Sequence, residues 1–150
     1  MASPIMLDDI RTMAQTIWGE ARGGDGDRIQ GEPEDFAAMC AVGRVILNRW
    51  RSGKWFGGLS IAATCLKKKQ FSCWNATDPN FKHLAKLTVA DKVFAECVRA
   101  AYAVLTDQDG GDRTLGACHY YAKSIPPPNW AVGKTPVAEI GGHLFFRDID

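Results

Sequence analysis

The residue best suited to chemistry in this sequence is Glu20, which closes an amphipathic segment just before a run of glycines. The apolar positions of the segment recur at helical spacing: Ile10, Met13, Ala14, Ile17 and Ala21. At roughly 100° per residue, Glu20 lies about 80° from the centre of this apolar stripe, which predicts a half-buried carboxyl group. Partial burial disfavours the charged form and raises a carboxyl pKa, as a general acid near neutral pH requires.

A solvated glutamate near a helix end is the competing interpretation of Glu20. The C-terminal end of a helix dipole favours cations, so helix stability does not explain an acid at this place. The position therefore favours a catalytic acid.

Helices that would position Glu20 are expected over the first two thirds of the chain. Asp8 or Asp9 can cap the first helix, Pro33 suits the first turn of the second, and a polar, glycine-rich loop lies between them. The expected helices cover residues 8–22, 33–53 and 59–66, and a longer helical region after Pro79 is best defined over 89–105. Gly43 within the apolar stripe of the second helix indicates close helix packing.

The pattern changes in the last third, where residues 116–122 and 137–146 are predicted to form short strands. The segment 124–130 between them holds three consecutive prolines and is expected to be largely polyproline-like. No internal repeat or linker divides the chain, so residues 1–150 are expected to form a single, mainly helical α+β domain.

The composition and the net charge of the chain argue against some classes of function. The hydrophobic fraction of 46% suits a soluble globular protein, and a net charge of +1 indicates no strong field for nucleic acid. No apolar run is long enough to span a membrane. The five cysteines include no Cys-x-x-Cys pair, and we expect them to be reduced, mostly buried side chains of a cytosolic protein.

Six segments, in this order, resemble the motifs of one known family. They are 16–23 with Glu-Ala-Arg-Gly, 41–49 with a closing Asn-Arg, 70–74 with Gln-Phe-Ser, 116–122 with His-Tyr-Tyr, 127–130 with Pro-Pro-Asn-Trp, and 140–146 with Ile-Gly-Gly-His. This set resembles the SleB-like family of cell-wall hydrolases, the spore-cortex-lytic-enzyme type. The resemblance runs from about Ile10 to Arg147, which is nearly the whole chain.

The resemblance implies a lysozyme-like α+β fold, mainly helical with a small antiparallel β-sheet near the C-terminus. It also implies a peptidoglycan-degrading enzyme that cleaves the β-1,4 bond between N-acetylmuramic acid and N-acetylglucosamine. Members are described as lytic transglycosylases in which the Glu of Glu-Ala-Arg-Gly is the catalytic acid, and this residue corresponds to Glu20. No metal or other cofactor is expected. The sequence departs from the family after Gly23, where residues 24–31 look like an insertion.

Seven further residues are candidates for binding the glycan. Gln70 and Ser72 offer hydrogen bonds to sugar hydroxyl or acetamido groups, whereas Phe71 is either a platform or, more in keeping with its type, a core residue. Trp130 follows three prolines and has little entropy to lose on stacking against a sugar, although it can equally cap the strand pair.

The remaining three candidates are consecutive on a predicted strand. His119 and Tyr121 share one face and Tyr120 lies on the other, so one face is expected to meet the core and the other the cleft. A tyrosine hydroxyl bonded to Glu20, or close to a developing oxocarbenium ion, would suit the chemistry.

A hydrolysing muramidase would catalyse the same cleavage differently, because hydrolysis normally uses a second carboxylate. No second acid belongs to a recognised motif, but five acids are candidates: Asp25, Asp27, Glu32, Glu34 and Glu139. Asp25 or Asp27 would have to hold a water opposite Glu20, as in an inverting enzyme.

Two competing hypotheses place the chain in a different class of protein. A zinc amidase that cleaves the bond between N-acetylmuramic acid and L-alanine would need ligands among His83, His119 and His143, but no His-Glu-x-x-His spacing is present. A non-catalytic glycan-binding or phage structural module would leave the half-buried Glu20 without a purpose.

Residues 1–9 carry two acids and no basic run, so we expect no signal peptide. This pattern resembles a phage endolysin that is made in the cytoplasm and acts on the bacterial cell wall after release. The expected partner is the glycan strand of peptidoglycan, with no nucleic acid and no membrane, and the protein is expected to be a monomer.

Overall fold

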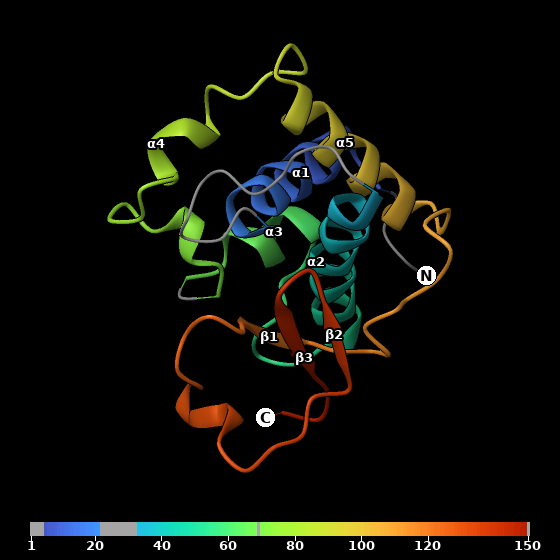
Figure 1. The fold of residues 1–150 in the computed structure, drawn as a ribbon. Coiled ribbons are helices and arrows are strands. Elements are labelled where there is room, and N and C mark those ends of the chain that lie inside the picture. Colours follow the sequence, from blue (N-terminus) through green and yellow to red (C-terminus); the bar gives the residue numbers. More distant parts are fainter. Residues whose placement is uncertain (1–4, 22–32, 69, 150) are drawn as a thin grey trace.

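A computed structural model describes residues 5–21, 33–68 and 70–149 (Figure 1). Its elements, in chain order, are α1 (Leu7–Ala21), α2 (Pro33–Ser52), α3 (Ile61–Leu66), the 3₁₀ turn η2 (Ser72–Trp74), α4 (Phe81–Leu84), α5 (Lys92–Leu105), β1 (His119–Ala122), the 3₁₀ turn η3 (Asn129–Ala131), β2 (Ala138–Ile140) and β3 (His143–Phe146). In Figure 1 the helices fill the upper part of the molecule, and the sheet lies below them beside the end of α2. The predicted α+β class is therefore confirmed.

The main core lies between α1, α2 and α5. Met13 and Ile17 of α1 are fully buried, because the apolar stripe read from the sequence faces the other two helices. Gly43 allows α2 to approach α5 closely, since a Cβ atom there would lie 3.2 Å from Val104 Cγ2. The close packing predicted at Gly43 is thus confirmed.

Helix α1 begins one residue before the first predicted cap. Asp9 is the third residue of the helix and reaches back, so that its Oδ2 accepts a hydrogen bond from the Met6 amide at 3.0 Å. Its Oδ1 accepts a second bond from the Ala62 amide, also at 3.0 Å. Asp9 therefore both closes the start of α1 and joins it to α3.

The helical region expected after Pro79 is two separate helices. The short α4 ends at Leu84, and α5 starts at Lys92 with the Asp91 carboxylate accepting from the Phe94 amide at 2.9 Å. Val89, placed at the start of the helix by its apolar side chain, instead lies in the connecting loop and is 67% exposed. An N-terminal cap defines this helix boundary more sharply than the apolar stripe does.

The sheet is antiparallel with strand order β1-β3-β2. The segment 137–146 is a hairpin, because Gly141 and Gly142 have φ values of 56° and 79° and form a two-residue turn. Tyr120 pairs with Phe145 and lies on the face that packs against Ala41 and Val45 of α2.

His119 pairs with Phe146 and lies on the opposite face of the sheet, beside η3. Among the helices that the structure describes, none has the length and apolar character to cross a bilayer.

Candidate active site

Glu20 lies half-buried in the last turn of α1, where two distant segments meet it. Ser72 of η2 places its Oγ 3.4 Å from Glu20 Oε2. Tyr120 of β1 brings its phenol close enough to the same carboxyl group to interact with it. Of the residues predicted from the sequence, the fold therefore brings Glu20, Ser72 and Tyr120 together.

Burial raises the pKa of Glu20 from its ordinary value of 4.5 to about 7, and the negative charge of Asp78 acts in the same direction. Hydrogen bonds from the Ser72 amide and hydroxyl, and the positive charge of Arg49, act in the opposite direction. With a pKa near neutrality, this carboxyl group can donate a proton and accept one at the same pH.

Close contact between α1 and η2 holds the two sides of this site together. Gly19 makes the contact possible, since a Cβ atom there would lie 2.5 Å from Cys73 Cβ. Trp74 Nε1 donates to Thr16 Oγ1 at 2.9 Å, and Asn80 Nδ2 donates to the Gly19 carbonyl at 3.1 Å. These bonds fix the segment that carries Ser72 along the last two turns of α1.

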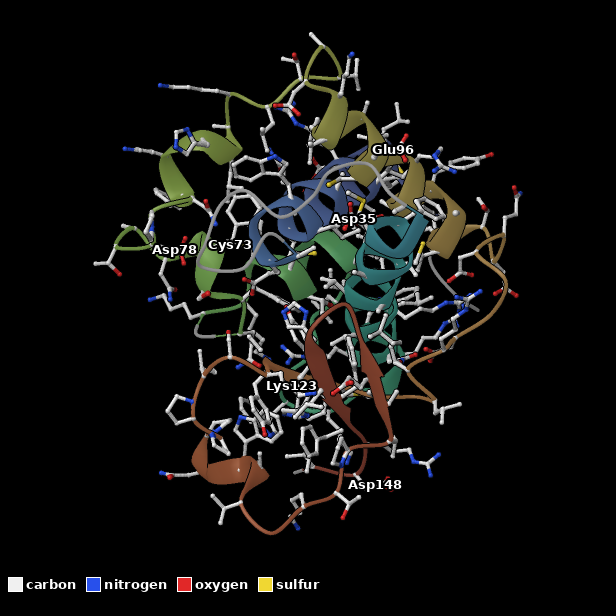
Figure 2. The ribbon with its side chains drawn as sticks, in the orientation of Figure 1. Asp35, Cys73, Asp78, Glu96, Lys123 and Asp148 are labelled. Carbon is white, nitrogen blue, oxygen red and sulfur yellow. The ribbon has the colours of Figure 1, made fainter. Side chains whose placement is uncertain are left out.

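Asp78 is a residue of the site that the sequence analysis missed. It is half-buried, and its Oδ1 accepts from the Asn80 amide at 2.8 Å in the turn that precedes α4. Figure 2 shows Asp78 on the same side of the molecule as Cys73, beside the end of α1. In the sequence, Asp-Pro-Asn indicates only a turn, and nothing in it predicts that the carboxylate comes near Glu20.

Tyr120 is held by aromatic packing on the face of the sheet that meets α2. Its ring stacks on Phe145 at a centroid distance of 5.6 Å and meets His143 edge-on at 5.1 Å. Burial, followed by the charge of Glu20, raises the tyrosine pKa well above its usual value. The phenol is therefore neutral and can donate a hydrogen bond to the Glu20 carboxylate.

The other predicted residues on the segment before η2 differ in accessibility. Gln70 is half-buried, and its Oε1 accepts a hydrogen bond from Arg49 Nη1 at 3.2 Å. Phe71 is 1% exposed and belongs to the main core, where the Arg49 guanidinium lies 4.7 Å from its ring centroid. Phe71 is therefore a core residue that packs against Arg49, and its side chain is not accessible to a ligand.

His119, Tyr121 and Trp130 form an aromatic group on the opposite face of the sheet from Tyr120. The His119 ring lies 4.9 Å from Phe56 and 5.2 Å from Trp130, and Trp130 packs edge-on against Phe146 at 5.2 Å. Burial, with the nearby charges of Arg49 and Lys54, lowers the His119 pKa to about 4. Trp130 is half-buried within η3, a placement that matches a role in capping the strand pair.

The acids named as candidates for hydrolysis do not join Glu20 in the described part of the chain. Glu139 Oε1 pairs with Lys123 Nζ at 2.9 Å on the exposed surface of the sheet. The remaining candidates lie outside the described residues, as does the insertion predicted over 24–31: Asp25, Asp27, Glu32 and the side chain of Glu34.

The histidines that a zinc amidase would need do not converge. His119 pairs with Phe146, and His143 pairs with Ala122, so the two imidazoles project from opposite faces of the sheet. His83 is exposed and lies against Trp18 at a centroid distance of 6.1 Å. Within residues 5–21, 33–68 and 70–149, no three His, Cys, Asp or Glu side chains are grouped as metal ligands.

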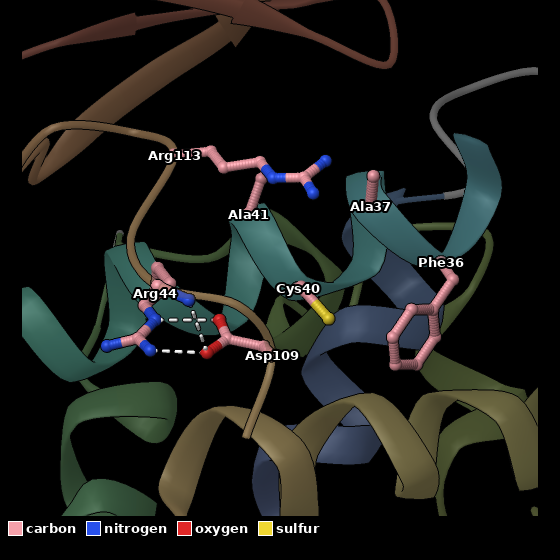
Figure 3. Close-up of a pocket in the computed structure, with 8 residues that line it drawn as sticks. Phe36, Ala37, Cys40, Ala41, Arg44, Asp109 and Arg113 are labelled. Atoms are coloured by element: carbon pink, nitrogen blue, oxygen red, sulfur yellow. Dashed lines mark hydrogen bonds and ion pairs between the residues drawn. The ribbon is translucent and has the colours of Figure 1, made fainter. Parts of the chain in front are cut away.

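A separate cavity of about 230 Å³ opens along α2 (Figure 3), and it is lined by Phe36, Ala37, Cys40, Ala41, Arg44, Asp109, Gly111 and Arg113. Two of its charged residues are already paired with each other, because Arg44 donates to both oxygens of Asp109 and, at 2.6 Å, to Asp107 Oδ1. This pairing ties α2 to the loop after α5, and the cavity has no part in the chemistry of Glu20.

The chain is similar to known proteins in sequence. The family described as Cell Wall Hydrolase matches residues 33–146, a range that includes Ser72 and Tyr120 and begins after Glu20. The spore cortex-lytic enzymes of Halalkalibacterium halodurans and Bacillus subtilis are each 29% identical over 140 residues, or 92% of this chain. The alignments cover 34% and 37% of those proteins, so the chain spans about a third of their length.

Two solved structures have the same fold. The catalytic domain of the germination-specific lytic transglycosylase SleB from Bacillus anthracis superposes with a TM-score of 0.64 at 20% identity, covering 98% of this chain and 100% of that one. The catalytic domain of the Bacillus cereus SleB protein gives 0.63 at 22% identity, covering 98% and 95%. The lysozyme-like α+β fold expected from the sequence resemblance is therefore confirmed.

Proposed function

Since the chain belongs to the cell wall hydrolase family, we propose that it cuts peptidoglycan glycan strands as a lytic transglycosylase, with Glu20 as its one catalytic carboxyl group. The bond cleaved is the β-1,4 link between N-acetylmuramic acid and N-acetylglucosamine. The observation that carries this proposal is the Glu20 carboxyl, half-buried with a pKa of about 7 and contacted by Ser72 and Tyr120.

In the first step, the protonated Glu20 gives its proton to the glycosidic oxygen while the bond from that oxygen to C1 of the muramic acid breaks. The N-acetylglucosamine fragment leaves with a free hydroxyl, and positive charge develops at C1. Burial that raises the pKa keeps a large share of Glu20 in the protonated form at neutral pH.

In the second step, the Glu20 carboxylate takes the proton from the C6 hydroxyl of the muramic acid. The C6 oxygen attacks C1 and closes a 1,6-anhydro ring, so that Glu20 is protonated again and no water is consumed. The neutral Tyr120 phenol can donate to the carboxylate between the two transfers. Ser72, which is exposed beside Glu20, and Gln70 are available to hydrogen-bond the sugars.

A hydrolysing muramidase is the second candidate, and one observation favours it. Asp78 lies close enough for its charge to act on Glu20, and hydrolysis needs a second carboxylate to activate water or to attack C1. A hydrolysed product retains an oxygen from solvent, which separates the two functions chemically.

We further propose that the protein is made in the cytoplasm and acts on the wall after release, in the manner of an endolysin. The five cysteines support folding in a reducing compartment, because all are free thiols. Burial raises the pKa of Cys40 to about 11 and that of Cys65 to about 12, which makes both unreactive.

The Glu20→Gln variant tests the assignment of the acid. It keeps the shape of the side chain and removes the proton, so we expect the initial rate of peptidoglycan digestion to fall by at least about a hundredfold. Glu96→Gln is the matched control, because Glu96 is a glutamate on α5 that pairs only with Arg99 at the surface of the described structure. A folded Glu20→Gln protein that digests peptidoglycan at a rate near that of the parent would overturn the assignment.

A further inference from the structure

Arg49, in the last turn of α2, is a buried cation whose charge is not neutralised in the usual way. Its residue is 5% exposed, and no carboxylate of the described residues lies within ion-pair distance of it. Arg44, five residues earlier on the same helix, is equally buried but pairs with two aspartates. Buried charges are normally paired, so Arg49 needs another explanation.

The hydrogen bonds of Arg49 connect the two segments that reach Glu20. Its Nε donates to the Cys118 carbonyl at 2.6 Å, and its Nη1 donates to Gln70 Oε1 at 3.2 Å. Cys118 stands two residues before Tyr120, and Gln70 stands two residues before Ser72. The guanidinium thus binds both segments that reach Glu20, in each case two residues before the side chain concerned, which is Tyr120 in one segment and Ser72 in the other.

Aromatic packing fixes the direction of the Arg49 side chain. Its guanidinium carbon lies 4.7 Å from the centroid of Phe71 and 5.9 Å from that of Phe56. A planar, five-donor guanidinium can stack on a ring and hydrogen-bond in two directions at once, whereas a lysine ammonium has no planar face to stack. The geometry therefore depends on arginine in particular.

The charged and titratable groups around Glu20 come from three sides. Asp78 acts from the turn before α4 and the neutral Cys73 thiol from η2, the neutral Tyr120 phenol acts from β1, and Arg49 acts from α2. Of these groups Arg49 is the cation, and its charge favours the ionised form of Glu20. In the catalytic cycle of the proposed reaction, that form follows the first proton transfer.

We propose that Arg49 is the positioning residue of this site: it holds Ser72 and Tyr120 against Glu20 and stabilises the Glu20 carboxylate between the two proton transfers. The inference rests on the proposed function, since it needs Glu20 to cycle between its two forms. It does not require Arg49 to touch the substrate.

The test compares Arg49→Gln and Arg49→Lys by the pH dependence of the digestion rate at low substrate concentration. The alkaline limb of this profile reports the loss of the Glu20 proton. Without the positive charge the Glu20 pKa rises, so Arg49→Gln should move the limb to higher pH and lower the maximal rate at least about tenfold. Arg49→Lys keeps the charge, so its limb should stay near that of the parent while its rate falls.

Arg44→Lys is the matched control for changing a different buried cation on the same helix. We expect it to lower the melting temperature by weakening the pairing with Asp107 and Asp109, and to leave the alkaline limb in place. Should Arg49→Gln not fold, as judged by circular dichroism, the Arg49→Lys variant still decides the positioning role through its rate.

A double-variant comparison separates positioning from a general loss of structure. If Arg49 acts through Tyr120, then Arg49→Lys should slow the parent much more than it slows a Tyr120→Phe protein. Additive effects in that cycle, or an alkaline limb unmoved in Arg49→Gln, would contradict the inference. The proposed function would survive that result as long as Glu20→Gln stays inactive, so the two can fail separately.

Discussion

Burial has the largest effect on the proton affinity of Glu20, and neighbouring groups adjust it in both directions. Asp78 disfavours the ionised carboxyl, whereas the Ser72 hydrogen bonds and, more weakly, the charge of Arg49 favour it, so the pKa of about 7 is a balance. The charges of Asp78 and Arg49 can each be removed alone, and the two removals have opposite signs. The site can therefore be examined by the direction of a pH shift as well as by loss of activity.

Replacing Asp78 by Asn should lower the pKa of Glu20, because it removes the negative charge that disfavours ionisation. The alkaline limb of the pH–rate profile then moves to lower pH, opposite to the movement expected for Arg49→Gln. An Asp78→Glu protein, which keeps the charge, should retain the limb of the parent. Complete loss of cleavage in Asp78→Asn at every pH would instead make Asp78 the second carboxylate of a hydrolase.

Local sequence predicted part of the site and not the rest, for a physical reason. Glu20 could be found because its angle to an apolar stripe is a property of one helix. Tyr120 was placed on a defined strand face, although the face that meets Glu20 depends on how the sheet docks. Arg49 closes the Asn-Arg motif of 41–49, whereas Asp78 has no motif of its own. Both act on Glu20 through contacts between residues far apart in the chain, which no local pattern indicates.

At the scale of the elements, the active site depends on the contact between α1 and η2. The helix presents a glycine where η2 packs against it, so the backbones come closer than any side chain would allow. Two hydrogen bonds maintain the contact: Trp74 donates to Thr16, three residues before Gly19, and Asn80 donates to the carbonyl of Gly19 itself. Ser72 reaches Glu20 as a consequence of this packing.

Gly19→Ala should therefore separate α1 from η2 and weaken catalysis. The added methyl group would lie 2.5 Å from Cys73 Cβ, and such overpacking costs about 1–3 kcal/mol. We expect a lower melting temperature and a digestion rate reduced at least about tenfold, because Ser72 moves with η2. Gly43→Ala is the control: its methyl group meets Val104 of α5 at 3.2 Å and not the 3₁₀ turn η2, so it should leave the specific activity of the folded protein unchanged.

The helices and strands were predicted best where residues typical of an element's end mark that end in the sequence. The pattern around Pro33 and the stripes of α1 and α2 predicted both helices closely. The break between α4 and α5 was not predicted, because apolar residues continue across it while the chain leaves the helix. The hairpin in 137–146 depends on positive φ values at Gly141 and Gly142, which an apolar pattern does not reveal.

At the scale of the whole molecule, the site exists only when the helical part and the sheet are docked. Glu20 and Ser72 belong to the helical part, whereas Tyr120 belongs to β1. Asn48 helps to join the two, since its Nδ2 donates to the Ala117 carbonyl at 3.0 Å and to Asp112 Oδ2 at 2.9 Å. Partial unfolding of either the helical part or the sheet should therefore abolish the activity completely.

The proposed reaction uses a single carboxyl group and cleaves the glycan without consuming water. Its most direct test is to digest purified peptidoglycan in water enriched in heavy oxygen, with excess chelator present, and to weigh the products by mass spectrometry. We predict 1,6-anhydromuramic ends that carry no heavy oxygen and are lighter by one water than hydrolysed ends. Reducing muramic ends that carry one heavy oxygen each would contradict the account and establish hydrolysis.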